Sequence, residues 1–432
     1  MKYIKFDQFQ KNHEVLTAYA NLAVENGASP ESVQEIADLY EQSANDALQK
    51  LRSLADKHGC SKEEPNEYDA ISALCEKGNE PKPVENIREK IAGAVLGRFS
   101  GCTLGVPVEG MDIWNMQHLA EDCGMGFPPT QYWTKVERPW GLAFNTEERA
   151  LFTKSGMCGV PVDDDITYPV ICLLILEKYG FGFTTENVGE YWVGHLKEAC
   201  TAELVALNNL KKGVAASDAA DIDNPYSQWI GALIRADAFG YVCAGDPHTA
   251  AMLAYKDAYL THRRNGIYGE MLFAAAIAAA FTVKDPLEAI RIGLREIPAA
   301  SSLYKDVRWA LDASDNVFDY LSARKAVDER FAGMSPVHTN NNACLIVFAL
   351  KTGKGDHTKT ISDAVAMGMD NDCTAATAGS IIGAIVGEKG IDPSWTAGFN
   401  NEVRTYIKDS ERISLPGLID RYVALYEKFR KA

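Results

Sequence analysis

Apolar residues at helical spacing fill this chain from Ile87 onward, and strand-like alternation of apolar and polar residues is rare. Alanine, leucine and isoleucine recur every three to four residues in the segments 87–100, 166–180, 187–213, 228–241, 247–261, 268–283, 286–295, 359–367, 374–387 and 416–430. No repeat of the solenoid type accompanies them. The pattern predicts an all-α fold, with one large multi-helix domain over residues 86–432.

Two of these predicted helices carry a glycine at every fourth position. The glycines are Gly93, Gly97 and Gly101 in the first helix, and Gly379, Gly383 and Gly387 in the second. Residues four apart lie on one face of a helix, and a face without side chains lets a neighbouring helix come close. We therefore expect both helices to pack closely against other helices.

The first 85 residues follow a different pattern. Ser, Pro and Glu at positions 29–31 form a helix start, with a hydroxyl cap, a proline in the first turn and an acid at the positive helix end. An apolar stripe at helical spacing runs over residues 33–54, and a polar, proline-marked stretch follows over 62–83. We predict a helical N-terminal extension over residues 1–85, with a boundary near 81–86.

Charge and cysteine usage restrict the class of protein. The 432 residues include 43 Lys and Arg against 59 Asp and Glu, a net charge of −16 that disfavours binding to nucleic-acid phosphates. The ten cysteines form no Cys-x-x-Cys pair, and several lie in apolar runs, as reduced thiols do. No signal peptide is recognisable, and the apolar runs Ala274–Phe281 and Ala375–Val386 are shorter than the ~20 residues that span a bilayer. We expect a soluble cytoplasmic protein that binds neither nucleic acid nor membrane.

Two acidic clusters each stand at the start of an apolar helix. They consist of Asp163, Asp164 and Asp165 in the first case, and of Asp370 and Asp372, followed by Cys373, in the second. Adjacent carboxylates repel one another, and a helix dipole offsets only about 0.3–1 kcal/mol per charge, whereas a hard cation offsets more. Each cluster alone fits a solvated helix cap as well as a metal site. Together, however, the five carboxylates can supply ligands for one or two ions of Mg²⁺ or Mn²⁺.

A third segment, Gly97–Glu109, closes a predicted helix with glycines and a proline and presents Glu109. A packed helix end with a surface glutamate would look the same. The three segments follow the patterns Gly-x3-Gly-x-x-Leu-Gly-x-Pro-x-Glu, Asp-Asp before a helix, and Gly-x-Asp-x-Asp-Cys before Ala-Ala-x-x-Gly. In this order and at these intervals, they resemble the motifs of the ADP-ribosylglycohydrolase family over about residues 87–390.

The resemblance implies an all-α fold with two divalent ions, Mg²⁺ or Mn²⁺, in a cleft. It also implies cleavage of the glycosidic bond at ribose C1 of ADP-ribosyl groups. The metal ligands that it implies are Asp163, Asp164, Asp165, Asp370, Asp372 and Cys373. We expect Glu109, at the position of the family's mobile glutamate, and Asp165 to be catalytic. Cys373 stands where the family has threonine, and because a thiol suits Mg²⁺ poorly, the neighbouring Thr374 could take its place.

Several other polar residues are candidates for substrate binding. They are Arg235, in the family's middle motif, His262, Asn265, Tyr268 and Glu270, in a polar loop, and Asn342, before an apolar helix. Basic and aromatic groups near an acidic metal centre would suit a phosphate-bearing or planar substrate. Each of these residues could equally be an ordinary loop, core or helix-cap residue.

Three functions stay open at this point. The first is a glycohydrolase that acts on ADP-ribosyl groups of a protein or small molecule. The second is a hydrolase of the same fold that acts on a small ribosyl compound or nucleoside-like glycoside. The third is a non-catalytic, crystallin-like structural protein, which the retained carboxylates disfavour. No phosphate-binding loop of an NTPase and no strand-associated Gly-x-Gly-x-x-Gly occurs, which disfavours nucleotide-dependent classes.

Overall fold

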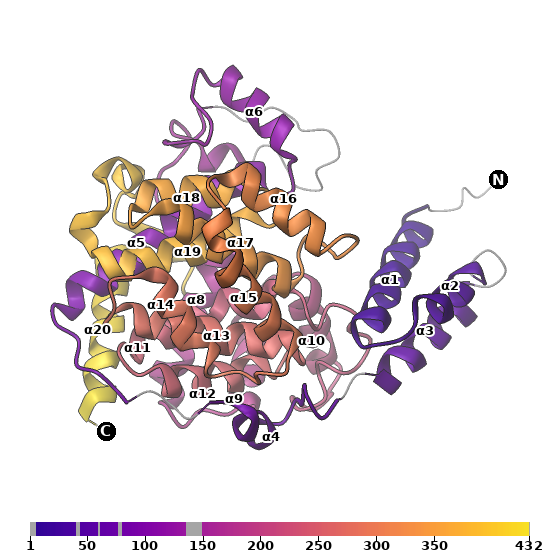
Figure 1. Cartoon of the computed structure of the whole chain (residues 1–432). Helices are drawn as coiled ribbons and strands as arrows, with labels where there is room; N and C mark the ends of the chain where they lie inside the picture. Colours follow the sequence, from indigo (N-terminus) through magenta and orange to yellow (C-terminus); the bar gives the residue numbers. More distant parts are fainter. Residues whose placement is uncertain (1–5, 40–43, 59–60, 77–79, 135–148, 432) are drawn as a thin grey trace.

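The computed structural model describes residues 6–39, 44–58, 61–76, 80–134 and 149–431, and this part of the chain is predominantly helical (Figure 1). Its α-helices are α1 (Phe6–Glu25), α2 (Pro30–Asp38), α3 (Ala44–His58), α4 (Tyr68–Leu74), α5 (Ile87–Gly105), α6 (Ile113–Asp122), α8 (Asp164–Tyr179), α9 (Thr185–His195), α10 (Thr201–Lys211), α11 (Ala236–Val242), α12 (Pro247–Ala258), α13 (Asn265–Ala280), α14 (Pro286–Leu294), α15 (Ser302–Ala313), α16 (Tyr320–Arg330), α17 (Thr339–Gly353), α18 (His357–Ala366), α19 (Asn371–Val386) and α20 (Leu415–Lys431). Short 3₁₀ helices are η1 (Val106–Val108), η2 (Ala150–Phe152), η3 (Ile230–Arg235), η4 (Ser314–Asn316), η5 (Glu388–Gly390), η6 (Pro393–Trp395) and η7 (Ala397–Phe399). The strands β1 (Glu402–Arg404) and β2 (Arg412–Ser414) form an antiparallel pair. The predicted all-α fold is confirmed.

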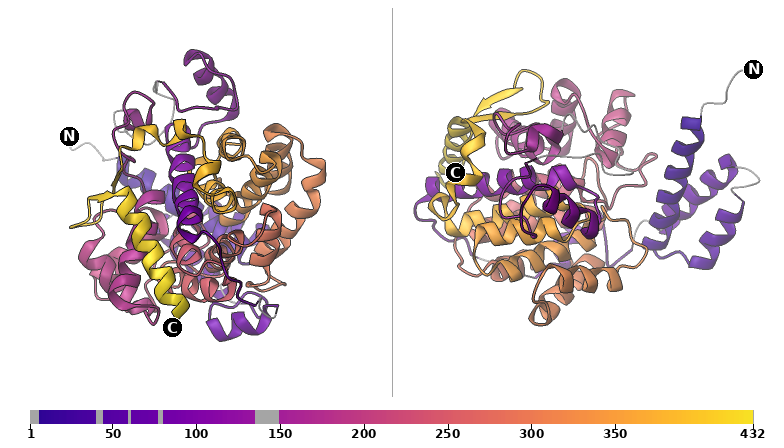
Figure 2. Two further views of the ribbon diagram at one scale, coloured as in Figure 1. Left: turned by 90° about the vertical axis from the view of Figure 1, so that its left-hand side faces the viewer. Right: turned by 90° about the horizontal axis from the view of Figure 1, so that it is seen from above.

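Helices α5 and α19 lie side by side (Figure 2), and they pack against each other through their glycine stripes. A Cβ atom added to Gly97 would overlap the carbonyl oxygen of Gly379, and a Cβ on Gly379 would overlap that of Gly97. The two backbones are therefore in direct contact, and the predicted close approach is confirmed. At the end of this contact, a Cβ on Gly105 would lie 2.6 Å from the backbone nitrogen of Asp372. The pairing thus places the end of α5 against the acidic start of α19.

Helix α13 forms the centre of the main core. Each of its residues is buried, and α11, α12, α14 and α17 pack around it. A helix that is apolar on all sides belongs inside a protein, which explains why its alanine-rich sequence has no polar face. The stretch 87–108, which includes α5, is long and apolar enough to cross a membrane, but it is buried inside the protein, as a core helix is. The nine cysteines in the described part of the chain are all free thiols.

Helices α1, α2 and α3 stand at one side of this body (Figures 1 and 2) and share a small apolar core of their own. Helix α2 begins as predicted, since the Ser29 hydroxyl accepts a hydrogen bond from the Ser32 backbone nitrogen at 3.2 Å. Residues 61–76, in contrast, pack on the main body. Ile71 of α4 lies fully buried in the main core. Helices α1–α3 therefore have a core of their own, whereas residues 61–76, which include part of the predicted linker stretch 62–83, pack on the larger unit.

Candidate metal centre and active site

A cavity of about 400 Å³ opens where the end of α5, the start of α8 and the start of α19 meet. Both acidic clusters and the predicted glutamate contribute to its wall through Glu109, Asp163, Asp164, Asp370, Asp372 and Cys373. Three segments that lie far apart in the sequence thus supply acidic groups to one cavity. We call it the metal cavity, after the chemistry that these groups suit.

The first cluster is fixed by the start of α8. Asp163 occupies the N-cap, and its Oδ1 accepts a hydrogen bond from the backbone nitrogen of Asp165 at 2.9 Å and from the Cys102 thiol at 3.3 Å. Asp164 follows in the first turn and lines the metal cavity. Asp163 therefore caps its helix, as the simpler interpretation expected, but it does so from the wall of the cavity.

Asp165 lies beneath the metal cavity and is fully buried. Its Oδ1 accepts a hydrogen bond from Arg98 Nη2 at 2.6 Å, and the same guanidinium bonds Asp237 Oδ2 at 2.6 Å. Arg98 comes from α5, so this buried ion pair ties α5 to α8. Asp165 does not line the cavity, which fits a supporting or metal-holding position better than the catalytic position predicted for it.

The second cluster opens α19 from a tight turn. Gly368 and Met369 both have positive φ, at 72° and 63°, and Asp370 follows at the N-cap. The backbone nitrogen of Gly110 donates a hydrogen bond to the Met369 carbonyl oxygen at 3.1 Å, which holds the Glu109 segment against this turn. The Asp370 carboxylate makes no capping hydrogen bond, and the residue is only 5% exposed. A solvated helix cap is therefore not what this cluster forms.

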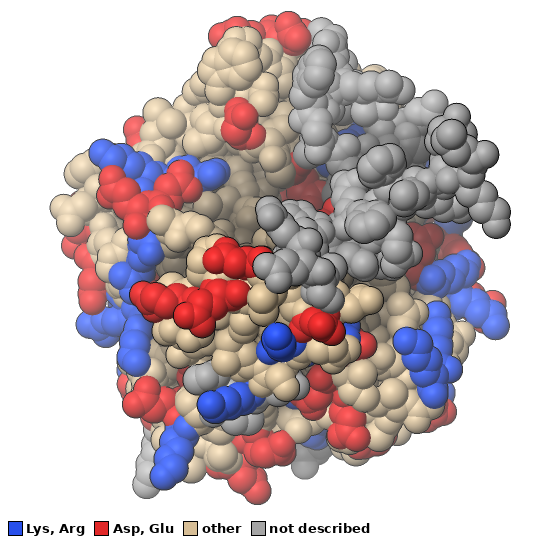
Figure 3. Space-filling model, turned by 90° about the vertical axis from the view of Figure 1, so that its right-hand side faces the viewer, with Lys and Arg blue, Asp and Glu red and all other residues tan. Residues whose placement is uncertain are grey.

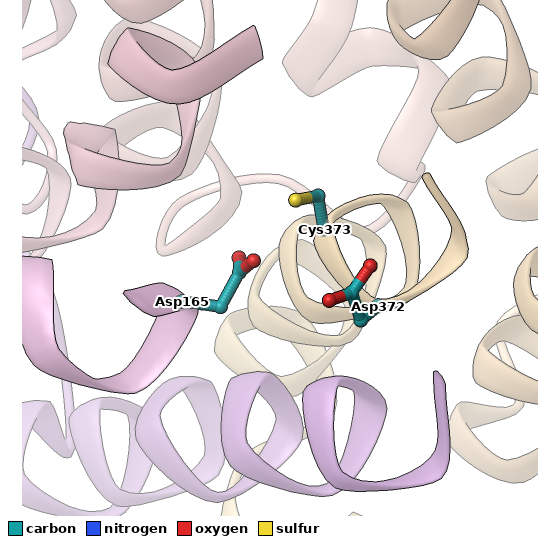
Figure 4. A group of neighbouring side chains, drawn as sticks. All are labelled: Asp165, Asp372 and Cys373. Carbon is teal, nitrogen blue, oxygen red and sulfur yellow. The ribbon is translucent and has the colours of Figure 1, made fainter. Parts of the chain in front are cut away.

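The side chains of the two clusters come within reach of a shared ligand. Potential ligand atoms of Asp165, Asp372 and Cys373 lie within 4.8 Å of one another, and Figure 4 shows them facing a common space from α8 and α19. The same holds for the set of Glu109, Asp370 and Asp372. Asp372 belongs to both sets and joins them into one centre.

Two buried carboxylate oxygens of this centre have no hydrogen-bond partner among the described residues. They are Oδ2 of Asp165 and Oδ1 of Asp372. A buried oxygen without a partner is costly, and a hard cation is a partner that carboxylates bind well. The donor set therefore fits divalent cations that prefer oxygen ligands.

The crowding of acidic groups in the metal cavity also favours a bound cation. Burial, together with the charge of Asp372, raises the pKa of Asp164 to about 6. Burial also raises the pKa of Glu109 well above its usual value, aided by Asp372 and Asp164 and opposed by Arg149, whose Nη2 lies 3.8 Å from Glu109 Oε2. Without a cation, protonation of these carboxyl groups is favoured relative to a solvated carboxylate, whereas a bound cation would favour their ionised forms.

Cys373 and Thr374 differ clearly in their surroundings. Cys373 lines the cavity and belongs to one of the ligand sets. Thr374 is fully buried, and its hydroxyl donates to the Asn371 carbonyl oxygen at 3.4 Å. Of the two alternatives that the sequence left open, the geometry favours Cys373, whose role as a ligand stays a prediction.

Residues of the cavity wall that sequence reasoning did not single out include Arg149, Cys200 and Glu203. Glu203 is the most notable, because it is a carboxylic acid on α10, outside every motif. Its Oε1 accepts a hydrogen bond from Arg235 Nη1 at 2.7 Å, and burial raises its pKa to about 7 although Arg235 opposes the shift. No sequence signal marked Glu203, since a single acid in a helix is common.

The six predicted substrate-binding residues do not line the metal cavity: Arg235, His262, Asn265, Tyr268, Glu270 and Asn342. Each is at most 2% exposed and is engaged in contacts within the protein. Arg235 is enclosed by the acidic side chains of Glu203, Asp257 and Glu270, so its charge is paired within the protein. Arg235 thus lies behind the cavity wall, where it bonds Glu203 and the Gly231 carbonyl oxygen.

The other four candidates make hydrogen bonds to other groups of the protein. The His262 Nδ1 lies 2.7 Å from the Thr261 hydroxyl oxygen, and the Tyr268 hydroxyl donates to the Pro65 carbonyl. The Asn265 side chain donates to Gln228 Oε1 at 2.8 Å. The Asn342 side chain donates to the Pro336 and His338 carbonyl oxygens at 2.8 and 2.9 Å. Because these polar atoms bond inside the fold, we leave the six residues out of the proposed site.

Comparison with known proteins agrees with this geometry. The chain matches the ADP-ribosylglycohydrolase family over residues 83–431, and it belongs to that family. An uncharacterized protein of Archaeoglobus fulgidus is 26% identical over 320 residues, which are 73% of this chain and 93% of the relative. A solved structure described as an ADP-ribosylglycohydrolase-related protein complex shares the fold, with a TM-score of 0.50 and 17% identity over 79% of this chain and 98% of its own. The match begins after α1–α4, which lie outside it.

Proposed function

We propose that this protein is a divalent-metal-dependent glycohydrolase that cleaves the bond at ribose C1 of an ADP-ribosyl group on a protein or small molecule. The observation that carries the proposal is the meeting of both acidic clusters and Glu109 at one cavity, with partnerless buried oxygens on Asp165 and Asp372. Membership of the ADP-ribosylglycohydrolase family supports the reaction class. The acidic groups favour an enzyme over a structural protein.

Mg²⁺ or Mn²⁺, as two ions, would be held by carboxylates of both clusters, with Asp372 shared between the sets and Cys373 at the edge. Bound there, the ions would activate a water molecule and orient the ribose hydroxyls. Asp165 would support the centre from below, because Arg98 fixes one of its oxygens at 2.6 Å and leaves the other available. Oxygen ligands suit both ions, while the sulfur of Cys373 suits Mn²⁺ better than Mg²⁺.

The chain's own residues can carry the proton transfers. Asp164 lines the cavity, so its carboxylate can accept a proton from the attacking water. Glu203 also lines the cavity and has a pKa raised to about 7, so it can donate a proton to the leaving group. The acidic wall would stabilise the positive charge that develops at C1. Glu109, close to Arg149, would position substrate or water at the end of its turn.

Metal analysis and turnover test the proposal together. The wild-type protein and Asp370→Ala are dialysed against millimolar Mg²⁺ or Mn²⁺ and analysed for bound metal. The matched control is Asp356→Ala, which removes an N-cap from α18, away from the cavity. Asp370→Ala should lose metal, whereas Asp356→Ala should keep it. A wild-type protein that binds neither ion would refute metal dependence and favour the structural protein.

Substrate choice is tested with the same preparations. ADP-ribosyl-arginine and ADP-ribosyl-serine are compared with free ribosides in the presence of Mg²⁺ or Mn²⁺. Hydrolysis of either ADP-ribosyl compound supports the proposal. Hydrolysis of free ribosides alone would instead favour the hydrolase of small ribosyl compounds.

A further inference from the structure

A second, larger cavity adjoins the metal cavity on the side of the N-terminal helices. Its volume is about 1040 Å³, and its wall is formed by α1, α10 and the segments around Tyr226 and Met334. Thr201 and Trp229 line both cavities, so the two spaces meet at these side chains. We call the second space the extension cavity. A molecule held in the metal cavity could continue into it.

Polar contacts fix α1 and α3 to the main body around this space. His338 Nε2 lies 3.2 Å from Glu25 Oε2 at the end of α1, and Arg52 of α3 pairs with Asp223 at 3.0 Å. The Gln228 side chain also donates to Asn26 Oδ1 at 3.3 Å. The wall that α1 provides is therefore held in place, and it comes from a part of the chain that the family match does not include.

The described wall is apolar, with charges of both signs at its edge. Its apolar members include Val15, Ala18, Leu204, Val205, Pro225 and Met334, and Leu204 is 43% exposed. Its charged members are Glu14 and Asp223 against Arg52 and Lys212. Figure 3 likewise shows acidic and basic side chains interspersed over the described surface on this side of the molecule. Without an excess of cations, this wall does not suit a phosphate-bearing group.

Two side-chain amides give the wall a second feature. Asn21 of α1, which is half-buried, and Asn208 of α10, which is exposed, both line the extension cavity, so their amide groups are accessible to a molecule held there. An amide offers a donor and an acceptor together, which matches the alternating groups of a peptide backbone. Apolar walls with a few such polar groups are typical of sites that hold organic ligands in place.

We propose that the extension cavity binds a polypeptide segment that flanks the ribosylated residue, so that the N-terminal helices select ADP-ribosylated protein over free ADP-ribosyl compounds. This inference rests on the proposed function, because it assigns the leaving-group side of the same substrate. The ribosyl bond would lie in the metal cavity, and the peptide would pass Thr201 and Trp229 into the space beneath α1.

The test compares two probes that differ only in the peptide. One is ADP-ribosyl-serine, and the other is the same residue within a ten-residue peptide; an arginine-linked pair is tested in parallel. Affinity is measured by calorimetry with EDTA present, so that the probes are not consumed, and hydrolysis is measured separately with Mg²⁺ or Mn²⁺. The wild-type protein should bind the peptide probe at least about tenfold more tightly than the free probe.

Substitutions on both sides of the extension cavity then locate the binding. Leu204→Asp on α10 and Asn21→Ala on α1 should each reduce the preference for the peptide, the first by about tenfold, since it places a charge on the apolar wall. Leu321→Asp is the matched control, because Leu321 is 49% exposed on α16 and lies outside both cavities. It should leave the preference unchanged.

The outcomes separate this inference from the proposed function. If both probes are hydrolysed and bind with equal affinity, the peptide site is overturned and the glycohydrolase activity stands. A preference for the peptide probe that survives Leu204→Asp would overturn the peptide site as well. A preference that Leu204→Asp removes, without hydrolysis of either probe, would support the peptide site while the proposed activity fails. Equal loss of preference in Leu321→Asp would also overturn the assignment.

Discussion

The buried side chain of Glu64 predicts where this chain can be shortened. Its Oε1 accepts hydrogen bonds from the Ser302 backbone nitrogen at 2.6 Å and from the Ser302 hydroxyl at 2.8 Å, and its Oε2 pairs with Arg264. The pKa of Glu64 is lowered, because Arg264 and Ser302 outweigh the effect of burial. A fragment of residues 86–432 lacks this partner, whereas a fragment of residues 61–432 keeps it.

The expected loss follows from two groups. Arg264 is 7% exposed, and removal of the partner of a buried ion pair costs about 3–5 kcal/mol. Loss of Ile71, which is fully buried in the main core, adds about 1.5–3 kcal/mol. The sum, about 4.5–8 kcal/mol, is a large part of the stability of a typical domain, about 5–15 kcal/mol. Fragment 86–432 should therefore unfold or aggregate, whereas fragment 61–432 should lose only the weaker contacts of α1–α3.

Urea unfolding of both fragments, followed by circular dichroism, measures this difference. In the full chain, Glu64→Gln should lower the free energy of unfolding by about 3 kcal/mol, because it removes the charge that faces Arg264. Glu63→Gln is the matched control, since this neighbouring side chain is exposed. Equal unfolding midpoints for the two fragments would refute the reasoning, and so would equal effects of the two Gln variants. The boundary predicted near 81–86 would then be supported.

Four further predictions concern the metal centre and its support. Glu109→Gln should fold normally and lose most turnover, which near-wild-type kcat would contradict. Cys373→Thr should hold or raise Mg²⁺ affinity and shift the preference from Mn²⁺ toward Mg²⁺ in calorimetric titrations; complete loss of metal would make the thiol a required ligand. Gly97→Ala should destabilise by about 1–3 kcal/mol in urea, while Gly194→Ala, which meets open space, should not. Burial raises the pKa of Glu203 to about 7, so the folded state holds the proton of this carboxyl group more tightly than the unfolded state does. The metal-free protein should therefore lose about 1–3 kcal/mol of stability as the pH rises from 5 to 8. Glu203→Gln should flatten that pH dependence, which urea unfolding at several pH values measures.

Local patterns were sufficient to predict the helical fold and the two helices that pack most closely, although not that they pack against each other. Glycine at every fourth position has one physical effect on a helix, which is to remove side chains from a face, so the close packing at Gly97 and Gly379 follows from their spacing alone. The start of α2 was also predicted from Ser29 and Pro30, because helix capping depends on residues that are adjacent in the sequence. Which helices pair is a property of tertiary packing, and the sequence pattern did not contain it.

The polar residues behind the site show the limit of that approach. Arg235 and Glu270 were predicted to bind substrate. A charged residue in a motif or loop can, however, either face a ligand or lie buried in an ion pair, and the sequence pattern is the same in both cases. The structure surrounds Arg235 with three carboxylates, and this environment depends on α10, α12 and α13 meeting at one point. Glu203 was missed for the same reason, since its position beside the cavity depends on these helices and not on its neighbours in sequence.

The proposed metal centre depends on the contact between the glycine stripes of α5 and α19. The contact between α5 and α19 ends at Gly105, where even one added carbon would displace the backbone of Asp372. Asp372 belongs to both ligand sets, and Arg98 on the same α5 holds Asp165. A substitution on the stripe should therefore change metal affinity as well as stability, although it touches no ligand. Since cation binding to the folded state adds to stability, metal should in turn tighten the α5–α19 contact.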